Sequence, residues 1–420
     1  VLEDITFTTG ANGSTNGISY TRGASFTLDL NGKTITSNLG NNALRFKIGD
    51  GNTVTDTEVT VLIKNGKIVS GSNNWCAISA ATADNSGNKL ILNLTDLTIE
   101  ANKAGDFAVK SWAGAVVNTN NVDVTSNYAG GFYAVGGEIV LDENSSVAQK
   151  GLHTAPYLSY AVGVSGGGKM TVNGGTYSAV PAAASDAYNQ GASHGSSVGG
   201  VMSSGGTLII NNGTFSNDNF GDAAPTAPRA LLMADAGAVV TINGGTFNAM
   251  AKIVDPTNNT GVASKNAVVT IAGGTYSANP TDAPYNLVKL AENYVAVENN
   301  GVWTVVEAGL SGEGTEANPY LISSVDDLVL FRNSVNAGET KYNAEGVYVA
   351  LGANIDLKDI DWACLWMVAG GFALGEGMSK TGLAKALVET IPFDSWPAMV
   401  VMIGGGLICW LLSQFISNSA

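Results

Sequence analysis

The sequence predicts a mainly β protein, in which a solenoid of short strands is followed by a small α+β segment and a C-terminal membrane-type helical hairpin. Three observations lead to this prediction. A β-type phrase recurs along the chain with the spacing of a solenoid repeat. The 420 residues include 53 Gly and only 13% charged residues, which suits strands joined by tight corners. Residues 396–416 contain no charged side chain, and a span of about 20 such residues can cross a bilayer.

The recurring phrase reads Thr-Val-Asn-Gly-Gly-Thr-Tyr at 171–177 and returns in variant form at 209–215, 241–247 and 270–276. Its glycines at 175, 213, 245 and 274 are 38, 32 and 29 residues apart. Alternating apolar residues before the glycines predict a strand, the Asn-Gly-Gly run predicts a tight corner, and the Thr-aromatic pair predicts a second strand. One such unit cannot bury its apolar face alone, so the units must stack.

A looser form of the same repeat occupies the first 150 residues. Its predicted strands lie at 26–35, 61–69, 92–99, 117–124 and 139–141, and Asp96 takes the place of the corner glycine in the third. Each segment alternates apolar and polar residues, as a half-buried strand does. We therefore expect residues 1–306 to form one right-handed parallel β-helix, closed by strands near 294–297 and 302–306.

This part of the chain resembles the β-helix surface proteins of gut-type bacteria and, more distantly, the pectate-lyase-like superfamily. The resemblance rests on the Asn-Gly-Gly-Thr-Phe/Tyr segments and on Leu-Asn-Gly-Lys-Thr-Ile at 30–35. It covers about three quarters of the chain. The repeated segments specify the fold well and the activity poorly.

The sequence pattern of residues 307–361 predicts a strand–helix–strand segment. A turn and strand fall at 312–322, Ser324 is suited to cap a helix over 325–335, and strands follow between 347 and 357. Asp326 and Asp327 in the first turn favour that helix through its dipole. The segment resembles the one that opens a GLUG-type repeat region in bacterial surface proteins.

Residues 362–420 predict hydrophobic helices, and the uncharged run at 396–416 predicts a membrane span. The stretch resembles a fragment of the divalent-anion/sodium symporter family, on Gly-Gly-Phe-Ala-Leu-Gly at 370–375, Ser-Lys-Thr-Gly-Leu-Ala at 379–384 and the closing residues. The resemblance implies that Ser417, Asn418 and Ser419 bind ion and substrate in an intact symporter. Such sites lie between two repeats, so this fragment is not expected to transport. The abrupt change near 358–362 indicates a chimera of two unrelated sequences.

Charge and composition exclude several function classes. The net charge is −15, with −1 in residues 362–420 and −14 in the rest, which argues against nucleic-acid binding. Three cysteines (Cys76, Cys364 and Cys409) and two histidines provide no metal spacing and no disulfide framework, so no cofactor is expected. Val1 is not a start methionine, which indicates either a removed signal peptide or a fragment.

Candidate groove residues lie on two excursions from the repeat, at 178–206 and 217–237. They are Asp186, His194, Arg229 and Asp235. In solenoids such excursions project from one face, often the binding face. The excursions provide neither the paired carboxylates of a glycosidase nor the carboxylate cluster with a basic residue that a lyase needs. These polar residues are therefore expected to be ordinary loop residues and not a set of catalytic residues.

The aromatic residues that end the repeated phrase have two interpretations. Tyr177, Phe215, Phe247 and Tyr276 could be platforms on which sugars stack. They recur at one place in the repeat, so a stacked position in the core is the favoured interpretation.

The sequence thus favours a non-catalytic, cell-surface or secreted solenoid that acts in adhesion or glycan binding. Its expected partners are glycans or a host surface, with residues 1–361 outside the cell and residues 362–420 in a membrane. The alternative is a polysaccharide-degrading β-helix enzyme, either a lyase or a glycoside hydrolase. Sodium-coupled anion transport applies only if the tail belongs to an intact symporter.

Overall fold

A computed structural model describes most of the first 355 residues, and the chain divides into two compact units, Val1–Ala308 (unit 1) and Gly309–Ala420 (unit 2). The described residues are 1–8, 15–50, 54, 57–71, 75–83, 87–102, 107–127, 130–150, 160–179, 198–201, 205–217, 230–250, 252–255, 266–283, 287–338, 340–355 and 380–382.

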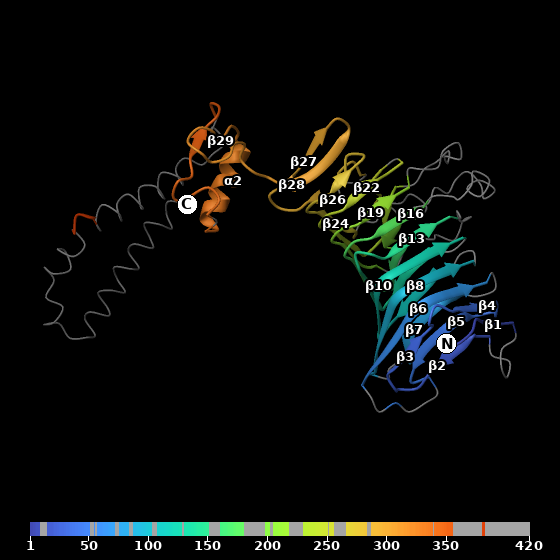
Figure 1. The fold of residues 1–420 in the computed structure, drawn as a ribbon. Helices are drawn as coiled ribbons and strands as arrows, with labels where there is room; N and C mark the ends of the chain where they lie inside the picture. The colour runs from blue at the N-terminus through green and yellow to red at the C-terminus, as the bar shows by residue number, and fades with distance from the viewer. Residues whose placement is uncertain are drawn as a thin grey trace, which may run out of the picture. The chain divides into compact units, whose positions relative to one another are not determined.

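Unit 1 is built from two sheets of stacked, mostly parallel strands (Figure 1). Sheet A contains β1 (Ile5–Phe7), β3 (Phe26–Asp29), β4 (Thr34–Ser37), β6 (Glu58–Ser70), β8 (Lys89–Ala101), β10 (Ala115–Ser126), β12 (Glu138–Leu141), β13 (Ser146–Gln149), β15 (Gly168–Val172), β16 (Thr176–Ala179), β18 (Gly206–Ile210), β19 (Thr214–Ser216), β21 (Ala238–Ile242), β22 (Thr246–Asn248), β24 (Val268–Ile271), β25 (Thr275–Tyr276), β26 (Val288–Leu290), β27 (Tyr294–Asn299) and β28 (Val302–Glu307). Sheet B contains β2 (Ile18–Tyr20), β5 (Asn42–Ile48), β7 (Cys76–Thr82), β9 (Phe107–Trp112), β11 (Gly130–Val135), β14 (Val162–Ser165), β17 (Gly199–Val201), β20 (Leu232–Ala234) and β23 (Val254–Asp255).

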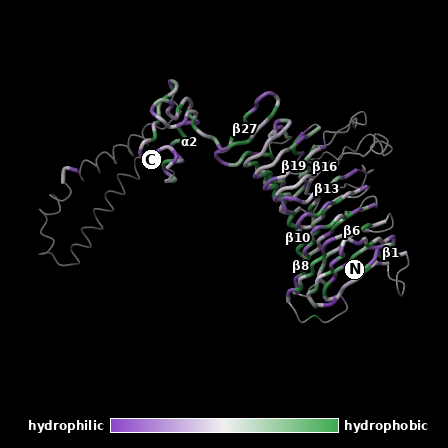
Figure 2. The backbone as a smooth tube through the Cα atoms, viewed as in Figure 1, coloured by the Kyte–Doolittle hydropathy of each residue, from purple (hydrophilic) through white to green (hydrophobic). Residues whose placement is uncertain are grey.

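The chain alternates between the sheets, so each coil contributes strands to both and stacks on the coil before it. Pairing is parallel and in register: Val61 of β6 lies beside Leu92 of β8, which lies beside Val117 of β10. These three side chains are fully buried, and residues of the same kind line the space between the sheets. Buried residues alternate with more exposed ones along the long strands of sheet A, β6, β8 and β10, and apolar and polar residues intersperse along the stack in Figure 2. The parallel, mainly β prediction for this part of the chain is confirmed.

The corners of the early coils depend on a column of Asn and Asp residues. Asn65, Asp96 and Asn121 have φ angles of 59°, 50° and 59°, the left-handed region that Asn and Asp tolerate better than most residues. Register places Asp96 beside Asn65, not beside Gly66, so the prediction that Asp96 replaces the corner glycine is wrong by one position. Gly66 is needed for space, because a Cβ there would lie 2.5 Å from the Cβ of Leu30.

The later coils turn at the last glycine of each repeated phrase, which has positive φ, as predicted. Gly175 has φ +92°, and an added Cβ would lie 2.0 Å from the Ser145 carbonyl oxygen. The aromatics that follow are at most 1% exposed and stack with centroid distances of 5.0, 5.1 and 4.9 Å, which confirms their place in the core. These aromatics are Tyr177, Phe215, Phe247 and Tyr276. They are therefore not exposed platforms for sugars.

The last coil is closed by a hairpin, in the region where the sequence predicts closure. β27 and β28 pair antiparallel, and β28 also pairs antiparallel with β25. One face of the hairpin packs on the core through Tyr294, Ala296, Trp303 and Val305. The reversal of strand direction ends the parallel stack without a further coil.

Unit 2 contains a short parallel strand pair and one helix among its described residues. β29 (Tyr320–Ile322) pairs with β30 (Val349–Leu351), and α2 spans Val325–Asn336. The Ser324 side chain accepts a hydrogen bond from the Asp327 amide at 3.1 Å, so the predicted helix and its cap are confirmed. A small core forms around Leu310, Ile322 and Tyr342.

Candidate functional site

The structure describes one of the predicted groove residues. Asp235 lies in the turn between β20 and β21, where its carboxylate accepts a hydrogen bond from the Ala236 amide at 2.6 Å and its carbonyl accepts one from Ala238. These contacts give it a role in shaping the corner. Asp186, His194 and Arg229 lie outside the described residues, as do Ser417, Asn418 and Ser419.

A different row of polar residues occupies the outer surface of sheet B. Register places Arg45 of β5, Ser79 of β7, Lys110 of β9 and Tyr133 of β11 side by side across four coils. Their neighbours along the strands point inward: Leu44 and Phe46 flank Arg45, and Ile78 and Ala80 flank Ser79, all at most 1% exposed. Strand alternation therefore directs this row outward.

Two hollows adjoin this row and share Ser79 and Trp112. One has a volume of about 330 Å³ and the other about 310 Å³, at the small end of the range for ligand pockets. Because they share residues, we treat them as one site and call it the sheet-face groove. Its described lining residues are Asn41, Asn42, Arg45, Lys47, Trp75, Cys76, Ser79, Ala81, Thr82, Lys110, Trp112, Ala113 and Val135.

Two tryptophans supply the aromatic surface of the groove. Trp75 is 57% exposed and Trp112 is 40% exposed, unlike the buried aromatics of the repeat. The Lys110 Nζ lies 5.8 Å from the centroid of Trp112 and 5.9 Å from that of Tyr133, within the range of a cation–π interaction. A positive charge therefore lies next to an exposed aromatic ring.

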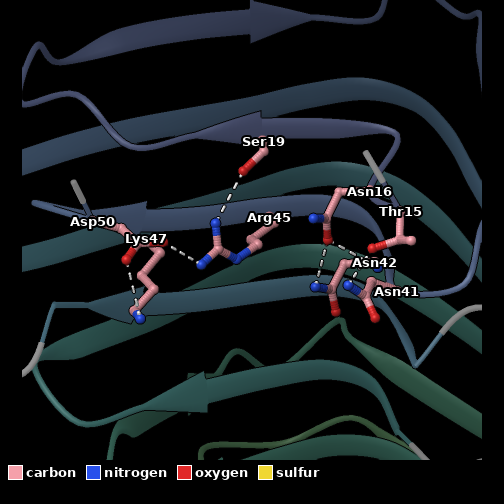
Figure 3. Close-up of polar contacts among 8 residues, drawn as sticks. All are labelled: Thr15, Asn16, Ser19, Asn41, Asn42, Arg45, Lys47 and Asp50. Atoms are coloured by element: carbon pink, nitrogen blue, oxygen red, sulfur yellow. Dashed lines mark hydrogen bonds and ion pairs between the residues drawn. The ribbon is translucent and has the colours of Figure 1, made fainter. Parts of the chain in front are cut away.

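The other cations of the groove come from β5. The Arg45 guanidinium contacts Asp50 at 2.5 Å and donates to the Ser19 hydroxyl at 3.1 Å, while Lys47 lies 3.3 Å from Asp50 (Figure 3). The hydrogen bond from Arg45 lowers the pKa of Asp50, so this carboxylate is ionised at neutral pH. Asp50 thereby fixes Arg45 in place and cancels one of the positive charges.

The far end of the same strands is fixed by amide side chains. The Asn42 Nδ2 donates to the Asn16 Oδ1 at 2.9 Å, and the Cys76 thiol lies 2.7 Å from the Asn42 Oδ1 (Figure 3 shows the Asn pair). These contacts run between coils, so the floor of the groove is a rigid sheet surface.

The charged residues that line the groove are cations. Among its described lining residues, three carry positive charge and none is a carboxylate or a histidine. Glycosidases need two carboxyl groups at a defined separation, and this residue set does not supply them. In the part of the chain that the structure describes, no group of three or more His, Cys, Asp or Glu side chains is arranged to hold a metal ion.

The groove was not predicted from the sequence, because β7 and β9 of sheet B are buried along most of their length and lack the alternation of a half-exposed strand. The available signal was two tryptophans, Trp75 and Trp112, set in segments 37 residues apart with Lys110 beside the second. The coil from β7 to β9 is 31 residues long, so the 37-residue spacing is not a repeat period, and only the register of the strands shows that the two tryptophans line one groove.

The tail of the chain is similar to a transporter family. Residues 350–420 match the family described as citrate transporter, a stretch that begins within β30 and covers about one sixth of the 420 residues. The prediction of a transporter-like fragment is confirmed, although the matching family is described by citrate, not by divalent anions in general. No curated protein and no solved structure matches the chain. None of the helices described here is long and apolar enough to cross a membrane.

Proposed function

We propose that unit 1 is a non-catalytic, cell-surface or secreted β-solenoid that binds glycans at the sheet-face groove. The observation that carries the proposal is the pair of exposed tryptophans, Trp75 and Trp112, beside hydrogen-bonding groups on a rigid sheet surface. We further propose that the coils form a right-handed parallel β-helix, since crossovers between parallel strands are almost always right-handed.

Glycans fit this surface because a sugar ring has an apolar face and a rim of hydroxyl groups. The flat side of an exposed tryptophan can cover the apolar face, and Ser79, Asn41 and Lys110 can bond the hydroxyl groups. Ligand sites generally combine aromatic walls with a few placed polar groups. The groove has both, and its floor is held by bonds between coils.

The test is binding of the full chain to a glycan array, followed by titration of the best ligand. Trp75→Ala and Trp112→Ala should each weaken that ligand at least tenfold, because each removes a stacking surface. Tyr348→Ala is the matched control, since Tyr348 is an exposed aromatic of unit 2, and it should leave the affinity unchanged.

Two outcomes would contradict the proposal. One is the absence of binding to any glycan on the array. The other is release of new reducing ends or unsaturated products from a bound polysaccharide, which would favour the alternative of a hydrolase or lyase. The missing carboxylate pair among the described lining residues makes the enzymatic alternative the weaker of the two.

For the tail we propose membrane association of residues 350–420, on the strength of their match to the citrate transporter family. We propose no transport by this stretch alone, because substrate sites of such proteins lie between two structural repeats.

We also propose that the described part of unit 2 is a GLUG-type segment, and that the chain is a chimera of two unrelated sequences. A contiguous DNA product across codons 340–380 of the source would contradict a chimera.

A further inference from the structure

We propose that the sheet-face groove selects glycans that carry carboxylate or sulfate groups over neutral glycans. This inference rests on the proposed glycan-binding function and names the ligand class. Its basis is a local reversal of charge at the groove, together with the placement of those charges beside the exposed tryptophans.

The charge of the described groove residues is opposite in sign to that of the chain. Arg45, Lys47 and Lys110 line it, and no carboxylate is among the described residues that do so. Asp50 contacts the first two, so the four side chains together carry 3 − 1 = +2. The whole chain carries −15. A cationic groove on an acidic protein draws anionic ligands to that place and repels them elsewhere.

The cations of the groove lie on two strands that are separated by a third. Arg45 and Lys47 lie on β5 and Lys110 lies on β9, with β7 between them, so they are roughly 10 Å apart at two strand spacings. Trp112 follows Lys110 by two residues and therefore shares its face. A sugar ring stacked at Trp112 would place one acidic substituent near Lys110, and a second along the chain near Arg45.

The preformed geometry of Arg45 adds to this selectivity. Its guanidinium is oriented by Ser19 and Asp50, so little side-chain entropy is lost when an anion arrives. Its Nη1 and Nη2 each use one N–H in those contacts, and the remaining N–H groups can donate charge-assisted hydrogen bonds to carboxylate or sulfate oxygens.

Nucleic acid is a poorer match for the same groove. Binding a phosphate backbone draws on about 6 to 10 cationic contacts, and the described groove offers three. An acidic sugar stacked on Trp112 needs only the contacts that are present.

The experiment compares polymers that differ in charge, using the full chain. Dextran and dextran sulfate form one pair, polygalacturonate supplies the carboxylate case, and single-stranded oligothymidine supplies a polyanion without sugar-ring recognition. Affinities are measured at low and at 0.5 M salt. Arg45→Gln and Lys110→Gln are compared with Lys289→Gln, an exposed cation on β26 outside the groove.

We expect at least tenfold tighter binding of dextran sulfate or polygalacturonate than of dextran, lost in high salt. Arg45→Gln and Lys110→Gln should each remove most of that preference, and Lys289→Gln should not. The polymer that shows the preference identifies sulfate or carboxylate as the recognised group.

Three results would overturn the inference. If neutral and anionic polymers bound with equal affinity and Trp112→Ala still weakened that binding, the groove would bind glycans without selecting for charge. If Lys289→Gln removed the preference for anionic polymers as fully as the groove variants do, the preference would come from the surface charge in general and not from the groove. Oligothymidine binding as tight as the best glycan would assign the groove to polyanions in general. No binding of any glycan would instead remove the proposed function itself.

Discussion

At the scale of single residues, two tyrosines in equivalent positions of the aromatic stack differ in one contact. The Tyr276 hydroxyl donates a hydrogen bond to the Gly273 carbonyl at 2.5 Å. The Tyr177 hydroxyl is buried and makes no hydrogen bond with any residue that the structure describes. Burial raises the pKa of both phenols, so neither ionises in the physiological range. The two positions therefore separate the contribution of the bond from that of the ring.

We expect Tyr177→Phe to leave the free energy of unfolding unchanged or to raise it, because it removes a buried polar group without a partner. Tyr276→Phe should lower it by about 1 kcal/mol through loss of the hydrogen bond. Urea unfolding of both variants beside the parent chain measures the difference. Equal destabilisation by the two substitutions would show that the Tyr177 hydroxyl has a partner in solution.

At the scale of elements, the corners and the strands were predictable to different degrees. Asn-Gly-Gly phrases located the corners of the later coils because positive φ angles restrict the residue type. The strands of sheet B were not predicted. β9 reads Phe-Ala-Val-Lys-Ser-Trp, with four of its first five residues buried, so the alternation that reveals a half-exposed strand is missing. The groove was missed for the same reason.

A pair of glycines tests how the corners work. Gly175→Ala should destabilise unit 1 by about 2 kcal/mol more than Gly301→Ala. Both glycines have positive φ, which costs alanine about 1 kcal/mol, but only at Gly175 would the new Cβ meet a backbone oxygen, 2.0 Å away. At Gly301 nothing lies within 4 Å.

Thermal unfolding followed by circular dichroism in the β region measures both glycine variants. Equal losses of stability would mean that neighbouring coils shift to accept the methyl group. The stacking of coils would then be looser at the corners than the close backbone approach implies.

At the scale of the whole molecule, the chain joins two units with different relationships to known proteins. Unit 1 is a parallel-stranded stack with its own extended core, and the match to citrate transporters begins only at residue 350. The two parts therefore permit separate tests of location and of binding.

We expect the full chain, expressed in bacteria, to stay in the membrane fraction after carbonate extraction. A chain that ends at residue 308 should be released, because the uncharged run at 396–416 supplies the apolar length for a bilayer. Release of both chains would contradict membrane association of the tail. Retention of both would assign it to unit 1 or to aggregation, which a sedimentation control distinguishes.

The repeat, the parallel β class of unit 1, the corners of the later coils and the cap of α2 could be predicted from the sequence. These features depend on local preferences: φ angles that suit Gly and Asn, alternation of side chains, and a Ser at a helix start. The residues that share the groove could be identified only from the stacked coils. Arg45, Lys110 and Trp75 lie on different coils, and their proximity depends on the register between strands, to which coil length, excursions and packing all contribute. Local sequence does not encode that sum, so the face that carries the candidate site became visible only once the coils were stacked.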